Sequence, residues 1–306
     1  MDRLEAMSIF VAAVETGSFS AASRKLDVPL PTVSRKVSEL EAHLKSRLLV
    51  RSTRKLALTE AGVAYLSACR RILDEVGNAE RTAAGEYSAP RGELVLTAPI
   101  VFGRLHVLPI VCDFLARFPE IDVRLVLSDR NVQLVDDQID IAVRIGALPD
   151  SSLVAMRVGS VTQVVGASPD FLAAQGTPKT PQDLEQLPCV AFDTVAAGAA
   201  WTFASVDGGR SQSVNVRMRL SVNTAEAAID AAIAGVGLVR VLSYQAAGAV
   251  DEGKLKLVLR KFERDPLPVS LVHKGQGHLP LKLRSFLDFA APRLKAVLAD
   301  RGRAGK

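Results

Sequence analysis

Apolar positions recur at helical spacing in two stretches near the N-terminus. The first stretch ends at Gly17 and consists of Leu4, Met7, Phe10, Val11 and Val14. The second begins near Pro31 and consists of Val33, Val37, Leu40 and Leu44. Spacings of three and four residues place each set on one face of a helix. Between the two helices, a short helix over residues 20–25, capped by Ser18 or Ser20, and a tight turn over residues 26–29 are predicted.

The predicted third helix carries a polar and basic face opposite its apolar face. Arg35 points almost directly away from the apolar face, and Ser34 and Lys36 lie at its edges. Two strand-like runs, residues 48–51 and 55–58, then indicate a hairpin with a basic tip. This order is typical of a winged helix-turn-helix, whose second helix enters the major groove of DNA. A plain three-helix bundle is the weaker alternative. The candidate DNA-binding residues are Ser20, Pro31, Thr32, Ser34, Arg35, Lys36, Ser38, Arg51 and Arg54.

Basic residues are concentrated in the same segment. Nine basic and three acidic residues lie between Arg24 and Lys55, a net charge of +6, whereas the whole chain carries +5 and the remainder therefore −1. A basic patch on an otherwise balanced protein is typical of a module that binds a polyanion. Most charge runs are only solvated surface, so the charge supports the helix-turn-helix interpretation without deciding it.

A segment without proline, residues 59–86, predicts one long helix. Apolar residues recur at sevens along it, as in Leu66 and Leu73, and in Cys69 and Val76. Such a heptad pattern suits pairing between helices. The alternative is burial against its own domain, although the helix is long for so small a domain. Cys69 is expected to be a small packing residue rather than a reactive thiol.

After residue 92, strand-like runs alternate with helical ones. The predicted strands include residues 93–98, 122–127, 139–145 and 269–273. The predicted helices include residues 105–118, 132–137, 223–234 and 281–298. Alternation of this kind predicts parallel sheets with helices on both faces. The fold class is therefore expected to be α/β and multidomain. The predicted parts are a winged helix-turn-helix (1–58), a linker helix (59–88) and a two-lobed domain (92–302), with lobe I at 92–161 and 267–302 and lobe II at 162–266.

Ligands of open α/β sheets bind beyond the carboxyl ends of the strands. The first such end, residues 97–104, leads directly into a helix, and a second helix starts near Asn223. Helix starts favour anions, so we expect a small organic acid between them. Asn223 is about as well explained as a helix cap, and Arg144 is better explained by pairing with Asp140 or Asp136. The candidate ligand-binding residues are Thr97, Ala98, Pro99, Phe102, Gly103, Arg144, Gly146 and Asn223.

Composition and motifs exclude several other classes. The chain is 48% hydrophobic and 23% charged, the balance of a globular protein. Its N-terminus lacks an export signal and no apolar run is long enough to cross a bilayer, so a cytoplasmic protein without membrane contact is expected. The three cysteines lie far apart, and neither they nor the four histidines have metal-ligand spacing. Because no catalytic or nucleotide-binding motif occurs, neither an enzyme nor a cofactor is predicted.

The N-terminal motifs resemble those of LysR-type transcriptional regulators. The matching stretches are Phe10-Val11-Ala12-Ala13-Val14, Gly17-Ser18-Phe19-Ser20-Ala21-Ala22, Val33-Ser34-Arg35-Lys36-Val37, Leu40-Glu41 and Leu58-Thr59-Glu60-Ala61-Gly62. Two positions differ from the family pattern: Lys45 stands where the family usually has Gly, and Leu49 where it usually has Phe. The C-terminal region looks like the effector-binding domain of the same family, a fold similar to type 2 periplasmic binding proteins. Ser128-Asp129-Arg130 and Arg144-Ile145-Gly146 are most like the branch with CrgA-type regulators.

The resemblance implies a regulator that binds double-stranded promoter or operator DNA and responds to a small-molecule effector. It also implies that the long helix pairs two subunits, giving homodimers and commonly homotetramers. The alternative from another class is a cytosolic solute-binding protein whose basic module serves only for assembly. The basic patch weighs against that alternative. An enzyme on the α/β scaffold would need a catalytic cluster, which the sequence lacks.

Overall fold

The structure is a computed structural model that describes residues 2–51, 56–83, 89–130, 139–148, 153–192, 200–205, 210–275 and 279–304. It divides into two compact units, Met1–Ala89 and Pro90–Lys306. The first unit contains α1 (Arg3–Thr16), α2 (Phe19–Leu26), α3 (Leu30–Leu44), β1 (Leu49–Arg51), β2 (Leu56–Leu58) and α4 (Glu60–Ala83). Strands β1 and β2 pair in antiparallel register, which confirms the predicted hairpin. Its predicted tip at residues 52–54 lies outside the described residues.

The two predicted apolar stripes form most of the core of the first unit. Phe10 of α1 and Val33, Val37 and Leu40 of α3 are fully buried. Leu4 is the exception, because it lies in the first turn of α1 and is 41% exposed. The first turns of α4 also belong to this core, since Tyr65, Leu66 and Cys69 pack against it.

Within its described residues, the second unit contains two five-stranded sheets and a two-stranded hairpin. The first sheet has the order β4 (Ile121–Leu127), β3 (Gly92–Ala98), β5 (Ile141–Ile145), β14 (Leu267–Lys274) and β6 (Leu153–Val161). The second has the order β11 (Arg217–Val222), β8 (Pro188–Phe192), β12 (Leu238–Leu242), β7 (Gln163–Ala167) and β13 (Lys256–Val258). Strands β9 (Ala200–Phe203) and β10 (Gln212–Asn215) form the hairpin.

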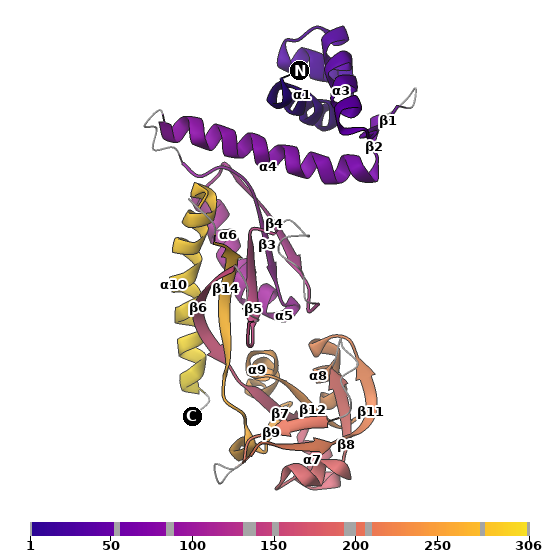
Figure 1. The fold of residues 1–306 in the computed structure, drawn as a ribbon. Helices are drawn as coiled ribbons and strands as arrows, with labels where there is room; N and C mark the ends of the chain where they lie inside the picture. The colour runs from indigo at the N-terminus through magenta and orange to yellow at the C-terminus, as the bar shows by residue number, and fades with distance from the viewer. Residues whose placement is uncertain are drawn as a thin grey trace. The chain divides into compact units, whose positions relative to one another are not determined.

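Helices complete both parts of this unit. Around the first sheet lie α5 (Ile100–Phe102), the π-helix η1 (Gly103–Val107), α6 (Leu108–Arg117) and α10 (Leu281–Ala304). The second sheet carries α7 (Pro169–Gln175), the short helix η2 (Pro181–Glu185), α8 (Ala225–Ile233), α9 (Ser243–Asp251) and the short helix η3 (Arg260–Phe262). Helices α6 and α10 pack together beside the first sheet, where the rings of Phe114 and Phe286 lie 5.1 Å apart (Figure 1). The helix predicted over residues 132–137 lies outside the described residues.

The architecture confirms the α/β, two-lobed prediction but corrects the expectation of parallel sheets. In the first sheet β3 runs parallel to β4 and β5, whereas β14 is antiparallel to both of its neighbours. In the second sheet β12 is antiparallel to β7. The reason is topological. The chain leaves the first sheet after β6 and re-enters it in β14, so the returning strand runs in the opposite direction.

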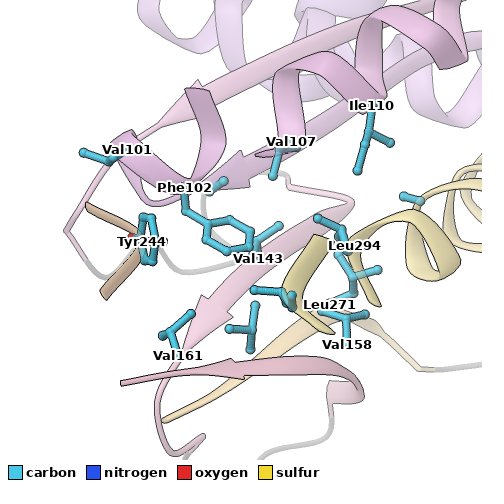
Figure 2. Packing of buried hydrophobic residues seen from close by; sticks show 14 of the residues in the cluster. Val101, Phe102, Val107, Ile110, Val143, Val158, Val161, Tyr244, Leu271 and Leu294 are labelled. Carbon is cyan, nitrogen blue, oxygen red and sulfur yellow. The ribbon is translucent and has the colours of Figure 1, made fainter. Parts of the chain in front are cut away.

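The two crossings between the sheets lie side by side. Val161 at the end of β6 pairs with Leu267 at the start of β14. Between β6 and β7, the carbonyl of Thr162 accepts a hydrogen bond from the Ser243 N–H at 2.8 Å, which fastens the start of α9 to the crossing. A single buried cluster extends from one sheet to the other. It includes Phe102 and Tyr244, whose rings lie 5.3 Å apart (Figure 2).

Candidate functional sites

Local hydrogen bonds shape the turn between α2 and α3. The side chain of Ser18, one of the two predicted caps, accepts a hydrogen bond from the Ala21 N–H at 3.1 Å, so α2 begins at Phe19. At the other end Asp27 adopts a left-handed conformation with φ 52°. The Ser23 hydroxyl donates to the Val28 carbonyl at 2.6 Å and holds the turn closed. This turn fixes the direction in which α3 leaves α2.

The outer face of α3 is basic, as the spacing predicted. The Arg35 side chain is 64% exposed and forms an ion pair with Glu39 at 3.5 Å. Lys36 differs, because its side chain is only 15% exposed and pairs with Glu5 of α1. Its ammonium group therefore holds α3 to the start of α1 as well as lying at the edge of the outer face.

The remaining predicted DNA-binding residues lie around this face. Ser20 is exposed in the first turn of α2, and Pro31 is exposed in the first turn of α3. Thr32, Ser34 and Ser38 are half-buried, and the Ser38 hydroxyl donates to the Ser34 carbonyl at 2.9 Å. Of the two remaining predicted residues, Arg51 ends β1, and Arg54 lies outside the described residues.

The junction between α3 and the hairpin relies on residues whose role the sequence did not suggest. The Glu41 carboxylate accepts hydrogen bonds from the N–H groups of Leu48 and Leu49 at 2.8 and 3.0 Å. Lys45 ends α3 with φ 51°, a left-handed conformation that favours glycine. At Gly62 a Cβ atom would lie 2.0 Å from the Leu48 carbonyl oxygen, so only glycine fits there. Glu41 and Gly62 thus both contact the chain at Leu48, where the hairpin begins.

The second unit contains a cavity of about 380 Å³ between its two sheets. This volume suits a small ligand, since such pockets measure roughly 300–1,000 Å³. Polar residues in the lining are Ser128, Asp129, Arg130, Arg144, Gln163, Arg240 and Gln245. Apolar and aromatic residues in the lining are Pro99, Ile145, Ala191, Phe192, Ala200, Trp201, Met218, Val241, Leu242, Tyr244 and Leu267. Within the described part of the lining, three arginines and one carboxylate give a net positive charge.

On the side of the second sheet, the cavity is lined by Arg240 of β12 and Trp201 of β9. The Arg240 guanidinium lies 5.1 Å from the centroid of the Trp201 ring and donates a hydrogen bond to the Thr202 carbonyl at 3.3 Å. A cation over an aromatic face is favourable, so this contact orients both side chains. The guanidinium is thereby held beside a flat apolar surface.

On the side of the first sheet, the cavity is lined by Arg144 of β5 and Asp129 beyond β4. Burial lowers the pKa of the Arg144 guanidinium, because the charged form is partly removed from water. Asp129 accepts a hydrogen bond from the Ile100 N–H at 3.0 Å. Burial is also the main cause that raises the pKa of Tyr244, with a further contribution from the Asp129 charge.

Only two of the eight predicted ligand-binding residues, Pro99 and Arg144, line this cavity. Thr97 and Phe102 lie outside this lining because both side chains are buried. Thr97 is 2% exposed and donates its hydroxyl hydrogen to the Val126 carbonyl at 2.9 Å within the sheet. Phe102 is fully buried in the core between the sheets (Figure 2). Neither side chain offers a surface to the cavity.

The other predicted positions also lie away from the cavity lining. Ala98 is buried, and a Cβ atom at Gly103 would lie 2.2 Å from the Leu127 side chain. Gly146 has φ 109°, which explains glycine at the end of β5 by backbone conformation. Asn223 is exposed, and Thr224 rather than Asn223 caps α8 by accepting a hydrogen bond from the Ala227 N–H at 3.3 Å.

The second predicted helix start is occupied by an ion pair. Glu226 in the first turn of α8 pairs with Arg104 of η1 at 2.7 Å, which links the two lobes. For Arg144, the proposed partner Asp140 accepts a hydrogen bond from the Val95 N–H at 2.8 Å, and Asp136 lies outside the described residues. The two predicted helix starts therefore do not form an open pair at the cavity, and the positive charge of the described lining comes from arginine side chains instead.

Sequence reasoning missed every residue that the second lobe contributes to the described lining. Two signals were available. Trp201 is the single tryptophan of the chain, and Arg240 is the single charge within the apolar run Leu238–Leu242. Burying a cation in an apolar strand costs free energy, so such a residue normally has a polar partner or is kept for a function.

Among the described residues, no cluster of three or more His, Cys, Asp or Glu side chains could hold a metal ion. In the same part of the chain, no single helix is long and apolar enough to span a membrane. Only α1 and α2 together reach that length and composition, and they are bent by 119° at their junction.

A winged helix-turn-helix followed by a two-lobed unit around a polar cavity defines a class: ligand-responsive DNA-binding proteins. Comparison with known families agrees. Residues 4–63 match the family described as "Bacterial regulatory helix-turn-helix protein, lysR family", and residues 88–295 match the LysR substrate binding domain. The chain belongs to the LysR family of bacterial transcriptional regulators. It is a DNA-binding transcriptional regulator with an effector-binding domain.

Named relatives and solved structures support this assignment. An HTH-type transcriptional repressor of Pseudomonas aeruginosa is 35% identical over 94% of this chain and 91% of its own length. CrgA of Neisseria meningitidis is 33% identical over 95% of this chain and 96% of its own length. The CrgA structure, with a TM-score of 0.60 and 31% identity, covers 95% of this chain and 98% of its own. The Vibrio cholerae virulence activator AphB has a TM-score of 0.59 at 26% identity, covering 94% and 98%.

Proposed function

We propose that this regulator binds operator DNA through α3 and its hairpin, and that a small organic acid in the cavity controls that binding. In this proposal residues 1–58 contact DNA, residues 59–88 pair the subunits of a homodimer or homotetramer, and residues 92–302 bind the effector. Lobe I comprises residues 92–161 and 267–302, and lobe II comprises residues 162–266. The observation that carries the effector class is the cavity, where three arginines stand beside aromatic surfaces.

The exposed cation on the outer face of α3 supports the DNA-binding part of the proposal. Arg35 projects from the helix opposite Val33, Val37 and Leu40, which are fully buried. A guanidinium in that position can reach base edges or phosphates once the helix lies in the major groove. The ion pair with Glu39 is exposed and therefore weak, so DNA phosphates can replace it at little cost.

Arg35→Ala tests this docking. We expect the change to weaken specific DNA binding by about 1–3 kcal/mol while leaving the fold intact, as measured by gel-shift titration and circular dichroism. Arg157→Ala, an exposed arginine on β6 in the other unit, is the matched control and should leave affinity unchanged. Unchanged affinity of the Arg35 variant would contradict the docking.

The hairpin arginines should behave differently from Arg35. Replacing Arg51 and Arg54 should weaken binding to all DNA sequences alike and flatten the salt dependence of DNA affinity.

The cavity supports an anionic effector with an apolar part. Arginine side chains bind carboxylates well because the guanidinium donates hydrogen bonds in a planar fork. Phe192, Trp201 and Met218 offer apolar surface in the same cavity. Binding there would contact β5 of one lobe and β12 of the other, so an effector would bias the arrangement of the lobes.

The single tryptophan provides a direct test, since Trp201 lies in the lining. Titration with a panel of aliphatic and aromatic carboxylates should include one that changes tryptophan fluorescence and raises the melting temperature. Arg144→Gln should weaken that binding about tenfold to a hundredfold, because a hydrogen bond to a charged group is lost. Arg157→Gln is the control for loss of one exposed arginine. Binding that is equal in wild type and in Arg144→Gln would place the effector elsewhere.

A solute-binding protein that uses its first unit only for assembly is the competing function. It predicts carboxylate binding without DNA binding. Sedimentation with non-specific DNA at low salt separates the two, because a regulator co-sediments with DNA and a solute-binding protein does not.

A further inference from the structure

Among the residues that the structure describes, Asp129 is the one carboxylate in the lining of an otherwise basic cavity. It follows β4 and reaches across to the turn after β3, where one of its oxygens accepts the Ile100 N–H at 3.0 Å. That bond gives the residue a structural role, since it satisfies the first backbone donor of α5. An ionised carboxylate has roughly four acceptor positions, however, and one backbone N–H occupies only one of them.

The rest of the Asp129 carboxylate has no partner within the part of the chain that the structure describes. The bond from Ile100 is its only hydrogen bond there, and none of the arginines in the lining forms an ion pair with it. Burial raises its pKa, the Ile100 N–H opposes that effect, and the nearby Glu226 carboxylate raises it further. Half-buried charges are normally paired or hydrogen-bonded, so acceptor capacity is left over at the cavity wall.

We propose that Asp129 is a specificity-determining residue, which selects among organic anions those that also carry an O–H or N–H donor. The arginines would hold the carboxylate of such a ligand, and Asp129 would accept a hydrogen bond from its hydroxyl or amino group. The effector class is then a hydroxy- or amino-carboxylate rather than a plain carboxylate. This inference rests on the proposed function, because it assumes that the effector occupies this cavity.

The physical reason for selection is the asymmetry of hydrogen bonding in a partly dry site. A ligand with a donor satisfies the free acceptor positions of Asp129. A ligand without one removes water from the carboxylate and supplies no replacement hydrogen bond, which costs more than the bond itself contributes. The same carboxylate therefore favours anions that carry a donor and rejects those that lack one.

A structural role alone is the competing explanation, and Asp129→Asn separates the two. In this variant the amide carbonyl oxygen of the new side chain can still accept the Ile100 N–H, so the turn after β3 is kept. The atom left for the ligand becomes an N–H₂ donor, which cannot accept from a hydroxyl. Asp140→Asn is the matched control, because Asp140 also accepts a backbone N–H in the same lobe, from Val95 at 2.8 Å, but does not line the cavity.

The first series of probes is phenylacetate, mandelate and O-methylmandelate. The second, smaller series is acetate, lactate and O-methyllactate. Phenylglycine is added as the amine counterpart of mandelate. In each series the middle compound carries a hydroxyl donor, whereas the smaller and the larger compound lack it. Tighter binding of the middle compound therefore cannot be explained by ligand size. Binding is followed by Trp201 fluorescence and by melting temperature. The melting temperature of each unliganded variant reports whether the fold is kept.

We expect wild type and Asp140→Asn to bind the donor-bearing member of a series at least about tenfold more tightly than either partner. In Asp129→Asn this preference should fall to about threefold or less, while the carboxylate itself still binds. Equal affinity of wild type for all members, or a preference that survives in Asp129→Asn, overturns the inference and leaves the proposed function standing. If no anion of the effector panel or of these series binds wild type, the proposed function fails and the inference fails with it.

Discussion

Cysteine environments differ sharply at the scale of single residues. Cys69 and Cys189 are fully buried, and burial raises the pKa of their thiols to about 11 and about 12. Cys112 is exposed on α6. Because the thiolate is the reactive form and needs access to reagent, the three thiols should not react alike.

We expect one thiol per chain to react rapidly with a disulfide reagent at about pH 8 under native conditions, and all three after denaturation. Mass spectrometry of the labelled protein should place the fast label on Cys112. Cys112→Ser is the control and should abolish the fast phase. Rapid labelling of Cys69 in the native protein would show that the start of α4 is not packed against α1 and α3 as described.

Single residues also show where sequence reasoning succeeds and where it stops. The exposed position of Arg35 on α3 is predictable, because the direction of a helical side chain follows from spacing alone. The places of Arg240 and Trp201 are not, since these residues lie on strands that belong to other sheets than Arg144 and line the same cavity only in the folded chain. The position of Phe102 at a strand end suggests a ligand contact, but an aromatic ring there can equally fill the core. The spacing of apolar and polar residues determines the face on which a side chain lies. It does not determine which cavity the end of a strand lines.

At the scale of elements, one carboxylate joins three helices of the first unit. Glu15 of α1 pairs with Lys25 of α2 at 3.0 Å and with Arg70 of α4 at 3.2 Å. Burial opposes ionisation of Glu15, but the hydrogen bonds and charges of its two partners outweigh burial, and its pKa is lowered from the ordinary 4.5. The pairs therefore stabilise the packing of these helices when Glu15 is ionised.

Glu15→Gln should loosen these helices by about 1 kcal/mol or less, because all three side chains are partly exposed. The lowered pKa fixes the pH dependence: the stabilisation is complete above the unfolded value and is lost as pH falls through the folded value. Hydrogen exchange of α2 and α4 amides should therefore be faster in the variant at about pH 7, and the difference should shrink at acidic pH. Glu75→Gln, at an exposed position of α4, is the control. A difference that persists unchanged in acid would exclude the ion pairs as its cause.

Elements can be predicted better than their directions. The positions of most helices and strands follow from periodicity, within a few residues, as for α3 and β3. The direction of β14 does not follow from periodicity, because the hydrophobic pattern of a strand is the same whether it pairs in parallel or antiparallel. What determines it is the route of the chain through the second sheet between residues 162 and 266. The π-helix η1 is likewise not predicted: it covers Gly103–Val107 and overlaps only the start of the helix predicted over residues 105–118.

At the scale of the whole molecule, α4 presents two kinds of apolar surface. Leu66 packs against the core of its own unit, so part of the predicted heptad face is buried within one chain. Val63 and Ile72 are 57% and 38% exposed, and their spacing of nine residues places them on opposite sides of the helix. A test of subunit pairing must therefore change the exposed set, because charges at Leu66 would damage the fold instead.

Val63→Glu combined with Ile72→Glu should yield particles of smaller mass in sedimentation, with unchanged circular dichroism. DNA affinity should fall with dimerisation, since two recognition helices must reach half-sites about one helical turn apart. Val63→Ala with Ile72→Ala is the milder control, which removes apolar area without adding charge. If the glutamate variant keeps the parent's mass, the subunits are joined through other surfaces.

The adjacent crossings at Val161 and Leu267 have a mechanical consequence for the effector-binding domain. These two neighbouring chain segments can act as a hinge. Torsional changes in a few of their backbone bonds would rotate one lobe as a rigid body against the other. Displacement in such a lever grows with distance from the hinge. A ligand that draws Arg144 and Arg240 together by a small amount would therefore move the far edge of the opposite lobe by much more. The restoring force would come from contacts such as Arg104 with Glu226, which break and re-form without unfolding either sheet.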